Sequence, residues 1–371
     1  MHFGQTTRLI TKFHINRRSI FMSKSIFKRI LPIIMGACAF MLLLGNLAVV
    51  NSFMPQVFQP AVIHTVCAVI LAAGCSFCKR DQILKAAPYL TGALFILLLA
   101  LPFFGYKVCG ALRWFRIGSV YFAPAAFAMP ILCLFWGWLL QQKGENFALK
   151  HKSILWGIFA FAAVLIFFQP FVGISFFILI LAAVLHCLSG GSTVRTILIG
   201  CGGFFAGIVL PLWINGRIGR MYTTSGPLFG LPCSSTYQTG QLLNVLKNSV
   251  FYGSAQTSGN APGFIIATPE SALILGCGKF GFVFLIAAVL LMLIIIAGGF
   301  IICRYEKDPV DRLLSGGMTT VLLLPFIVNL LTMFGFLPPG SIGFPFLSYG
   351  GSALLASAFA FSFFFRRKKS E

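Results

Sequence analysis

Residues 313–365 read LLSGGMTTVLLLPFIVNLLTMFGFLPPGSIGFPFLSYGGSALLASAFAFSFFF, a run of 53 residues without a charged side chain. A helix needs about 20 apolar residues to cross the hydrocarbon core of a bilayer, so this run is long enough for two spans. Pro338-Pro339-Gly340 divides the run near its middle, and proline and glycine interrupt helices. The run therefore predicts two transmembrane helices joined by a turn.

The composition of the whole chain agrees with this run. Of the 371 residues, 58% are apolar and 9% are charged, whereas a soluble domain carries about 25% charged residues. Such a chain cannot cover a water-facing surface, so the sequence predicts an all-α integral membrane protein. Counting the other charge-free runs in the same way gives eight more spans and a total of ten; these runs are 30–78 (two spans), 86–106, 117–142, 153–194 (two spans), 196–216 and 280–303.

The segment between the seventh and eighth spans is too polar to cross a membrane. It is rich in glycine, serine, threonine and asparagine, and unsatisfied backbone groups are costly in lipid. The sequence therefore predicts a large loop over about residues 214–278. Loops of this length are usually functional or disordered.

The distribution of Lys and Arg predicts the orientation. Of the 28 basic residues, 21 lie in the termini and in every second loop, and seven lie in the other loops. The positive-inside rule then places both termini in the cytoplasm and the large loop outside. The resulting organisation is a basic cytoplasmic tail over residues 1–29, a membrane domain over 30–366 and a short cytoplasmic tail over 367–371.

Acidic side chains are distributed even more unevenly. Six of the seven Asp and Glu lie on the cytoplasmic side, and Glu270 is the only one expected outside. No acid falls within a span, whereas ion-coupled transporters usually need carboxylates inside the membrane. The pattern argues against a coupled transporter. It leaves an outer face with seven cations and one carboxylate.

Residues 345–352, Pro-Phe-Leu-Ser-Tyr-Gly-Gly-Ser, resemble a known family signature. The FtsW/RodA/SpoVE family, also called the SEDS proteins, begins its last helix with a "PF-x-SYGGS" run. Further passages resemble the family in the same order along residues 30–366; they are Arg113-Trp114, Phe122-Ala123-Pro124, Gln169-Pro170 with Gly173, Arg217-Ile218, Glu270 with Gly276, and Asn329. The chain is therefore identified as a divergent member of this family.

The resemblance implies a ten-helix fold and an activity. SEDS proteins polymerise lipid II into glycan strands in bacterial cell-wall synthesis, during division, elongation or sporulation, in the cytoplasmic membrane. The implied partners are lipid II, a class B penicillin-binding transpeptidase and the division or elongation machinery, without nucleic acid. The family also implies that a divalent cation, Mg or Mn, can assist. With one outer carboxylate, no dedicated protein site for that cation is expected.

Three departures from the family pattern concern charged residues. The family's "PSE-x-x-K" reads Pro-Ala-Ala-Phe-Ala-Met over residues 124–129, so an acid and a base are missing together. Phe171 stands where the family has the Asp of "QPD", and Glu270 stands where it has its catalytic Asp. Loss of both members of a buried pair can be neutral, whereas loss of one member strands a charge. The departures bear on catalysis more than on the fold.

Glu270 is the candidate catalytic base, because transfer of a glycosyl group requires removal of a proton from the acceptor hydroxyl. The other interpretation of Glu270 is an acid in the first turn of a helix, after Thr268-Pro269. Arg113 and Trp114 are candidates for lining the substrate cavity, or belong to an interfacial belt of aromatic and basic residues.

The remaining candidates are two arginines and two residues of the C-terminal motif. Arg217 and Arg220 are candidates for binding pyrophosphate, since Arg suits phosphate, or simply end a helix. Ser348 and Tyr349 are candidate substrate-binding residues, or form only a turn and a helix start. Two other functions stay open: a catalytically degenerate protein that binds lipid II or a transpeptidase as a scaffold, and a lipid flippase.

Overall fold

The computed structural model of the chain describes residues 30–108, 111–118, 120–144, 147, 149–169, 171–191, 245–253, 271–334 and 342–365. The predicted tails 1–29 and 367–371 and the predicted seventh span, 196–216, lie outside these residues. Most of the predicted outer loop, 214–278, lies outside them as well.

Seven helices in the described part are long and apolar enough to cross a membrane; they are Ile30–Phe53, Pro55–Phe77, Arg80–Phe104, Pro124–Lys143, Lys150–Phe168, Phe282–Tyr305 and Pro309–Met333. Two apolar helices are shorter, Gly173–Leu188 and Gly351–Phe365. Together these helices fall on nine of the ten predicted spans, and the tenth is the one outside the described residues. The prediction of a multi-span helical membrane protein is confirmed.

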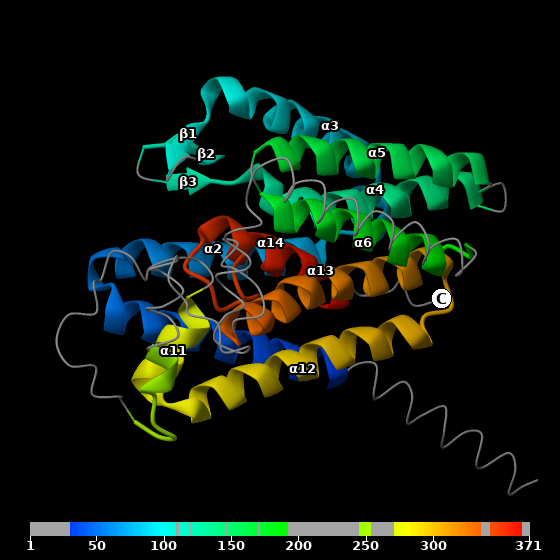
Figure 1. Cartoon of the computed structure of the whole chain (residues 1–371). Coiled ribbons are helices and arrows are strands. Elements are labelled where there is room, and N and C mark those ends of the chain that lie inside the picture. The colour runs from blue at the N-terminus through cyan, green and yellow to red at the C-terminus, as the bar shows by residue number, and fades with distance from the viewer. Residues whose placement is uncertain are drawn as a thin grey trace, which may run out of the picture.

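The labelled helices of Figure 1 are α2 (Phe58–Phe77), α3 (Arg80–Phe104), α4 (Ala128–Lys143), α5 (Leu149–Phe168), α6 (Val172–Leu188), α11 (Ala272–Phe280), α12 (Phe282–Tyr305), α13 (Pro309–Met333) and α14 (Gly351–Ser362). Short 3-10 turns η1 (Pro55–Val57), η2 (Pro124–Phe127) and η4 (Phe363–Phe365) extend three of these helices. The predicted break at Gln169-Pro170 is confirmed, since α5 ends at Phe168 and α6 begins at Val172.

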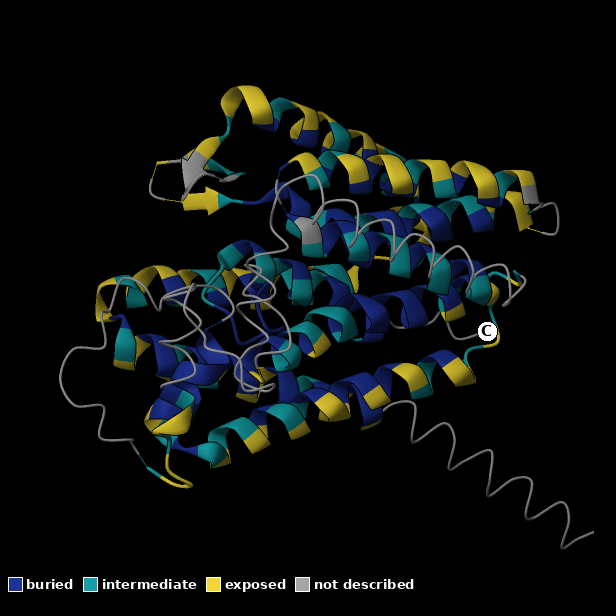
Figure 2. Ribbon diagram, in the orientation of Figure 1, coloured by how far each residue is buried: buried dark blue, intermediate teal, exposed yellow. Residues whose placement is uncertain are grey.

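Helix α13 forms the centre of the bundle. It packs against α12, α6, α4 and α14, and Figure 2 shows it mostly dark blue, whereas α3 and α12 carry exposed residues on their outer sides. Small residues let neighbouring helices approach closely in membranes. At Gly316 the side chains of Leu188 and Cys303 occupy the space of a Cβ, and at Gly317 Cys133 does the same.

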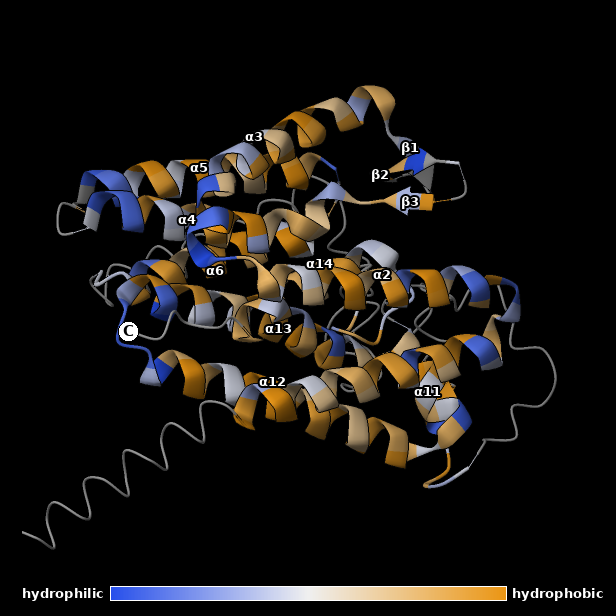
Figure 3. Ribbon diagram, turned by 180° about the vertical axis from the view of Figure 1, so that it is seen from behind, coloured by the Kyte–Doolittle hydropathy of each residue, from blue (hydrophilic) through white to orange (hydrophobic). Residues whose placement is uncertain are grey.

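Hydrophobic residues follow the middle of the long helices, and hydrophilic residues gather near the helix ends (Figure 3). Many large apolar side chains on the outside of the bundle are exposed, for example Ile70 of α2 and Ile96 of α3. In a soluble protein such a surface would be an aggregation hazard. In a bilayer it faces lipid, which agrees with the membrane assignment.

The connection between the third and fourth spans is not a simple loop. It forms a three-stranded antiparallel sheet of β1 (Tyr106–Val108), β2 (Ala111–Ile117) and β3 (Val120–Phe122), in the order β1-β2-β3. Gly118 takes a φ of 62° at the turn between β2 and β3, a conformation that glycine adopts readily. No strand was predicted here, so the all-α description needs this small sheet added. Helix α11 likewise begins inside the predicted outer loop and ends just after it, at Phe280.

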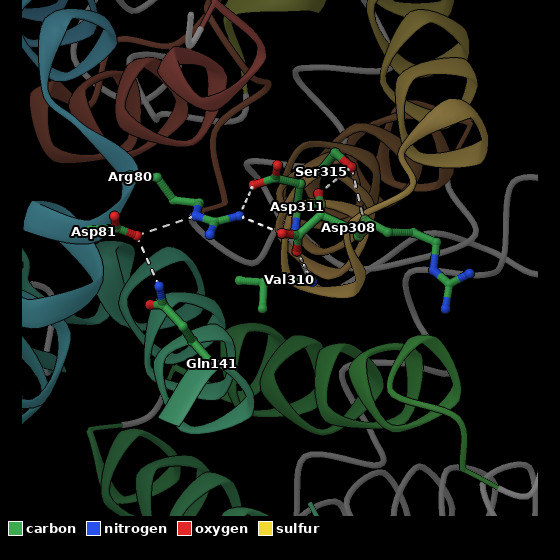
Figure 4. Close-up of polar contacts among 8 residues, drawn as sticks. Arg80, Asp81, Gln141, Asp308, Val310, Asp311 and Ser315 are labelled. Carbon is green, nitrogen blue, oxygen red and sulfur yellow. Dashed lines mark hydrogen bonds and ion pairs between the residues drawn. The ribbon is translucent and has the colours of Figure 1, made fainter. Parts of the chain in front are cut away.

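A network of charged and polar side chains joins α3, α4 and α13 at the end of the bundle opposite the sheet (Figure 4). Arg80 Nη1 lies 2.9 Å from Asp308 Oδ2 and 3.1 Å from Asp311 Oδ1. Arg80 Nε lies 3.5 Å from Asp81, which accepts a hydrogen bond from Gln141 at 2.8 Å. Asp308 also caps α13 by accepting from the backbone N–H groups of residues 310 and 311. We call this network the Arg80 clamp.

Replacing Arg80 with alanine is expected to lower the free energy of unfolding by about 1 kcal/mol, the upper range for partly exposed pairs. The variant leaves Asp308 and Asp311 facing each other without their shared cation. Thermal unfolding in detergent measures the loss. Arg304→Ala is the matched control, since Arg304 is exposed at the end of α12, and an equal loss in both variants would contradict the role of the clamp.

The clamp also predicts a pH dependence. Burial raises the pKa of Asp308, but hydrogen bonds from Arg80 and Val310 and the charge of Arg80 outweigh it, so the pKa lies below its ordinary value of 3.8. Because the folded pKa is lowered, this stabilisation is complete above the ordinary value and is lost as the pH falls below it. The difference in unfolding free energy between wild type and Arg80→Ala should be constant above about pH 5 and shrink in stronger acid.

Candidate functional site

The structure describes four of the seven candidate site residues. Arg113 and Trp114 lie in β2, and Ser348 and Tyr349 lie in the turn before α14. Glu270, Arg217 and Arg220 lie outside the described residues. Glu270 directly precedes Ser271, the N-cap of α11, and Figure 1 shows α11 and the sheet at the same end of the bundle. We call this end the sheet end.

The turn formed by residues 342–350 is buried rather than open. Phe344 and Leu347 form an isolated bridge, and between them Phe346 has a φ of 62°, which is costly for a bulky residue. The ring of Phe346 packs edge-on against Phe361 of α14, with centroids 5.4 Å apart. Side-chain burial therefore holds this turn in its unusual conformation.

Two polar side chains support the same turn. Asn329 of α13 donates from Nδ2 to the carbonyl of Ile342 at 3.0 Å. Ser348 is buried, and its Oγ accepts from the backbone N–H of Gly350 at 3.2 Å. Tyr349 is only half-buried. Of the two motif residues proposed for substrate binding, Tyr349 is the more accessible and Ser348 shapes the turn.

Two glycines, one in the motif and one just before it, are required by close approaches. A Cβ at Gly351 would lie 2.8 Å from the His64 ring of α2, far inside van der Waals contact. A Cβ at Gly343 would collide with the side chain of Ser348. Gly351 is therefore explained first by packing of the motif against α2, and Gly343 by packing of the turn against itself.

The start of α6 joins the sheet to this turn. The guanidinium of Arg113 lies 4.7 Å from the ring centroid of Phe171, which is a cation–π distance. Gln169 donates from Nε2 to the carbonyl of Leu98 in α3 at 3.1 Å. A Cβ at Gly173 would collide with the Ile342 side chain. Segments around residues 113, 171 and 342 are thus neighbours at the sheet end.

The stretch where the family has an acid and a base is apolar and packed. Met129, at the position of the family's base, is buried, and Ala126, at the position of its acid, is partly buried. The backbone N–H of Ala123 donates to Ser352 Oγ of α14 at 2.9 Å. This bond ties the start of η2 to the first turn of α14. Because both charged residues are absent, the start of η2 contacts the first turn of α14 closely. This stretch contains no buried charge without a partner.

The electrostatics of the sheet end follow from the acids that the structure describes. These are Asp81, Glu306, Asp308 and Asp311, all in or near the Arg80 clamp and so away from the sheet end.

Burial raises the pKa of Tyr349 above its ordinary value, and the nearby Tyr121 raises it further. Tyr349 therefore stays protonated at neutral pH and can donate a hydrogen bond.

A metal centre has no support among the described side chains. The part of the chain that the structure describes contains no group of three or more His, Cys, Asp or Glu side chains that could hold a metal ion. A divalent cation prefers carboxylate and carbonyl oxygens, and no described carboxylate lies at the sheet end. The described residues therefore do not fit a dedicated divalent-cation site.

Sequence reasoning missed three features. The Arg80 clamp joins residues 228 and 231 positions apart in the chain, and its members were counted only as loop charges. The contact between His64 and Gly351 has no local signal. The aromatic and β-branched residues on either side of Gly118, such as Trp114, Phe115, Val120 and Tyr121, were the available sign of the sheet.

Comparison with known proteins gives the same assignment at the level of the family. Residues 26–370 match the FtsW/RodA/SpoVE family, described as cell cycle proteins. The probable peptidoglycan glycosyltransferase FtsW of Geobacter sp. (strain M18) is 27% identical over 282 residues, which cover 73% of this chain and 75% of that protein. The corresponding protein of Bacillus subtilis (strain 168) is 27% identical over 287 residues, covering 70% and 67%.

Two solved structures share the fold. The crystal structure of the Thermus thermophilus rod shape determining protein RodA has a TM-score of 0.64 at 19% identity and covers 88% of this chain and 93% of that one. A chain of a peptidoglycan synthase complex has a TM-score of 0.70 at 20% identity, covering 90% and 95%. Because the family match spans nearly the whole chain, this protein belongs to the FtsW/RodA/SpoVE (SEDS) family and is a multi-pass protein of the bacterial cytoplasmic membrane.

Proposed function

We propose that this protein is a peptidoglycan glycosyltransferase that polymerises lipid II into glycan strands at the outer face of the membrane. The observation that carries the proposal is the meeting of distant family passages at the sheet end. Arg113 contacts Phe171, and Ala123 bonds to Ser352. Family membership and the names of the relatives support the same activity.

The proposed reaction joins two lipid-linked sugars. The acceptor hydroxyl attacks the anomeric carbon of the donor, the bond from that carbon to the pyrophosphate oxygen breaks, and the lipid pyrophosphate leaves. Glu270 takes the proton of the acceptor hydroxyl. Outer cations, with Arg217 and Arg220 as candidates, stabilise the leaving pyrophosphate. Pyrophosphate departs without protonation, so a single carboxylate suffices.

Arg113, Trp114 and Tyr349 are proposed to line the substrate site, and Ser348 to position the turn beside it. Arg113 already lies against an aromatic ring, so its position is fixed before any substrate binds. Such preorganised cations stabilise developing negative charge without reorganisation. Phe171 stands where the family has an Asp, so no carboxylate at this position neutralises the charge of Arg113. The electrostatic potential around Arg113 therefore stays positive.

The proposal includes ten spans with both termini in the cytoplasm and the loop 214–278 outside. In a chain whose eleven native cysteines are replaced by alanine, a thiol reagent that cannot cross membranes should label an engineered Ser258→Cys in intact cells. Ser370→Cys in the predicted cytoplasmic tail is the matched control and should react only after permeabilisation. The opposite pattern would reverse the orientation and remove Glu270 from the outer face.

The central experiment is polymerisation of purified lipid II by the full chain, with and without a class B penicillin-binding transpeptidase. That partner is proposed because one solved structure with this fold is a chain of a peptidoglycan synthase complex that coordinates polymerisation and crosslinking. Glycan strands formed in the presence of the partner are the expected product. No strands under either condition would contradict the proposed activity.

The apolar residues at positions 126, 129 and 171, where the family has charged residues, favour one alternative, a scaffold that binds lipid II without polymerising it. This alternative predicts that lipid II binds the purified chain while no glycan forms. A flippase instead predicts transbilayer movement of labelled lipid II in liposomes. The three functions therefore give three different results with the same substrate.

A further inference from the structure

One face of the small sheet carries two tyrosines and an arginine. Arg116 of β2 pairs with Tyr121 of β3 in the register of the sheet. The rings of Tyr106 and Tyr121 lie 5.8 Å apart, and the Arg116 guanidinium lies 5.1 Å from Tyr106 and 6.0 Å from Tyr121. The two tyrosines are 42% and 43% exposed. We call these three residues the tyrosine face.

The tyrosine face continues inward to the turn before α14. Strand β3 packs against α14, and the backbone N–H of Ala123, directly after β3, donates to Ser352 Oγ, so Tyr121 and Tyr349 lie on neighbouring segments. Tyr349 itself packs beside Val50 and Met54, at the end of the first helix. The exposed rings thus lead from the surface of the sheet to the motif that Tyr349 belongs to.

The charge of this region is positive. Residues 105–123 contain Lys107, Arg113 and Arg116 and no acid. Arg116 uses its Nε to donate to the carbonyl of Gly118 at 3.1 Å, and no contact between described residues engages its Nη groups in a hydrogen bond. Those Nη groups are therefore available for an anionic or hydroxyl-rich ligand.

The chemistry of the face matches a sugar polymer that bears carboxylates. A pyranose ring has an apolar C–H side that stacks on an aromatic ring and a rim of hydroxyl groups that bond to polar tips. Tyrosine supplies a flat apolar ring with a hydroxyl at its end. A guanidinium beside the rings suits the carboxylates of peptides attached to such a strand.

We propose that the tyrosine face binds the glycan strand, a polymer of β-linked sugars carrying peptide carboxylates, as it extends from the site beside Tyr349. This inference rests on the proposed function and names where its product lies. A lipid headgroup belt is the competing occupant. The face favours the glycan because its row of rings leads to the turn at the site, whereas a belt would follow the outer rim of the helices.

The first test measures binding in the absence of polymerisation. The probes are lipid-free, uncrosslinked glycan fragments with peptide stems and chitohexaose, and the receptor is the full chain in phosphatidylglycerol nanodiscs. Tyr106→Ala and Tyr121→Ala should each weaken the binding of both probes about tenfold, the order expected for a lost aromatic contact. Tyr121→Phe keeps the ring and should bind nearly as wild type does.

Two further variants sharpen this test. Arg116→Gln should weaken the peptide-bearing fragment more than chitohexaose, because only the former carries carboxylates. Tyr252→Ala is the matched control, since Tyr252 is an exposed tyrosine outside the face, and it should bind both probes unchanged. Wild-type affinity in Tyr106→Ala and Tyr121→Ala, with unchanged melting temperatures, would overturn the proposal.

The second test uses the polymerisation product. At equal consumption of lipid II, Tyr121→Ala should give shorter strands than Tyr252→Ala, because the strand dissociates sooner. If even the wild type forms no strands, the proposed function fails, but binding of the fragments still decides the tyrosine face. If the variants instead lose affinity for phosphatidylglycerol vesicles and keep fragment binding, the face is a headgroup belt.

Discussion

Polymerisation of lipid II is expected to stop when Glu270 is replaced by glutamine. Glutamine keeps the size of the side chain but cannot accept a proton, and a positioned base contributes about 10²–10⁴-fold to such a reaction. Under the predicted topology Glu270 is the single outer carboxylate of the chain, so no second acid is at hand to replace it. The rate of strand formation, measured on lipid II, should fall by at least 100-fold.

Two control variants make this result specific. Glu145→Gln removes an acid from a predicted cytoplasmic loop and should polymerise as wild type does. Glu270→Gln should still bind lipid II, since the base acts on the acceptor hydroxyl and not on the pyrophosphate. Full activity in Glu270→Gln would show that Glu270 only complements the start of α11, for about 0.3–1 kcal/mol.

Glu270→Asp tests the geometry of the site. The family has Asp at this position, and the extra methylene of Glu displaces the carboxylate by about an ångström, which can change a rate by about 10²-fold. A faster Asp variant would mean that the pocket keeps the geometry of the family. A slower one would mean that this pocket has adjusted to Glu.

The second large effect is expected at Gly281, the corner between α11 and α12. Gly281 has a φ of 84° and a ψ of −179°, a region that only glycine adopts without strain. A Cβ there would lie 2.6 Å from the carbonyl oxygen of Phe251 and 2.8 Å from that of Val250. The same carbonyls accept hydrogen bonds from the backbone of residues 282 and 283. A side chain at Gly281 must therefore break this corner.

Gly281→Ala should lower the free energy of unfolding by about 2–4 kcal/mol, from backbone strain and the displaced carbonyls together. It should also reduce polymerisation, because α11 directly follows Glu270. Thermal unfolding in detergent and the lipid II assay measure the two effects. Gly157→Ala is the control, since a Cβ there meets nothing within 4 Å and alanine favours a helix. Equal stability of the two variants would contradict this account.

The helices were predictable because lipid sets their length. Charge-free runs located them, and Pro170 marked the break between α5 and α6. The sheet was not predicted, since its strands are three to seven residues long, too short for a periodic signal. The Arg80 clamp depends on contacts between distant segments, which no local pattern encodes.

For the candidate site, the sequence predicted residue types better than roles. Phe171 was recognised as a departure from the family, but its contact with Arg113 follows from folding of the sheet onto α6. Ser348 lies buried in the turn, and its role in substrate binding stays a prediction. Glu270, Arg217 and Arg220 stay predictions. A motif indicates which residue types occur together in the sequence. The packing of the folded chain decides which of these side chains are exposed to a ligand.

The ring of Phe346 reaches Phe361, fifteen positions further along the chain, and Phe361 in turn packs edge-on against Phe364 and Phe365. The segment before α14 is therefore anchored near the far end of its own helix. Insertion of one residue between Phe346 and Phe361 would move the first ring away from the second and displace α14. Insertions for tags or probes are therefore least tolerated between these two phenylalanines.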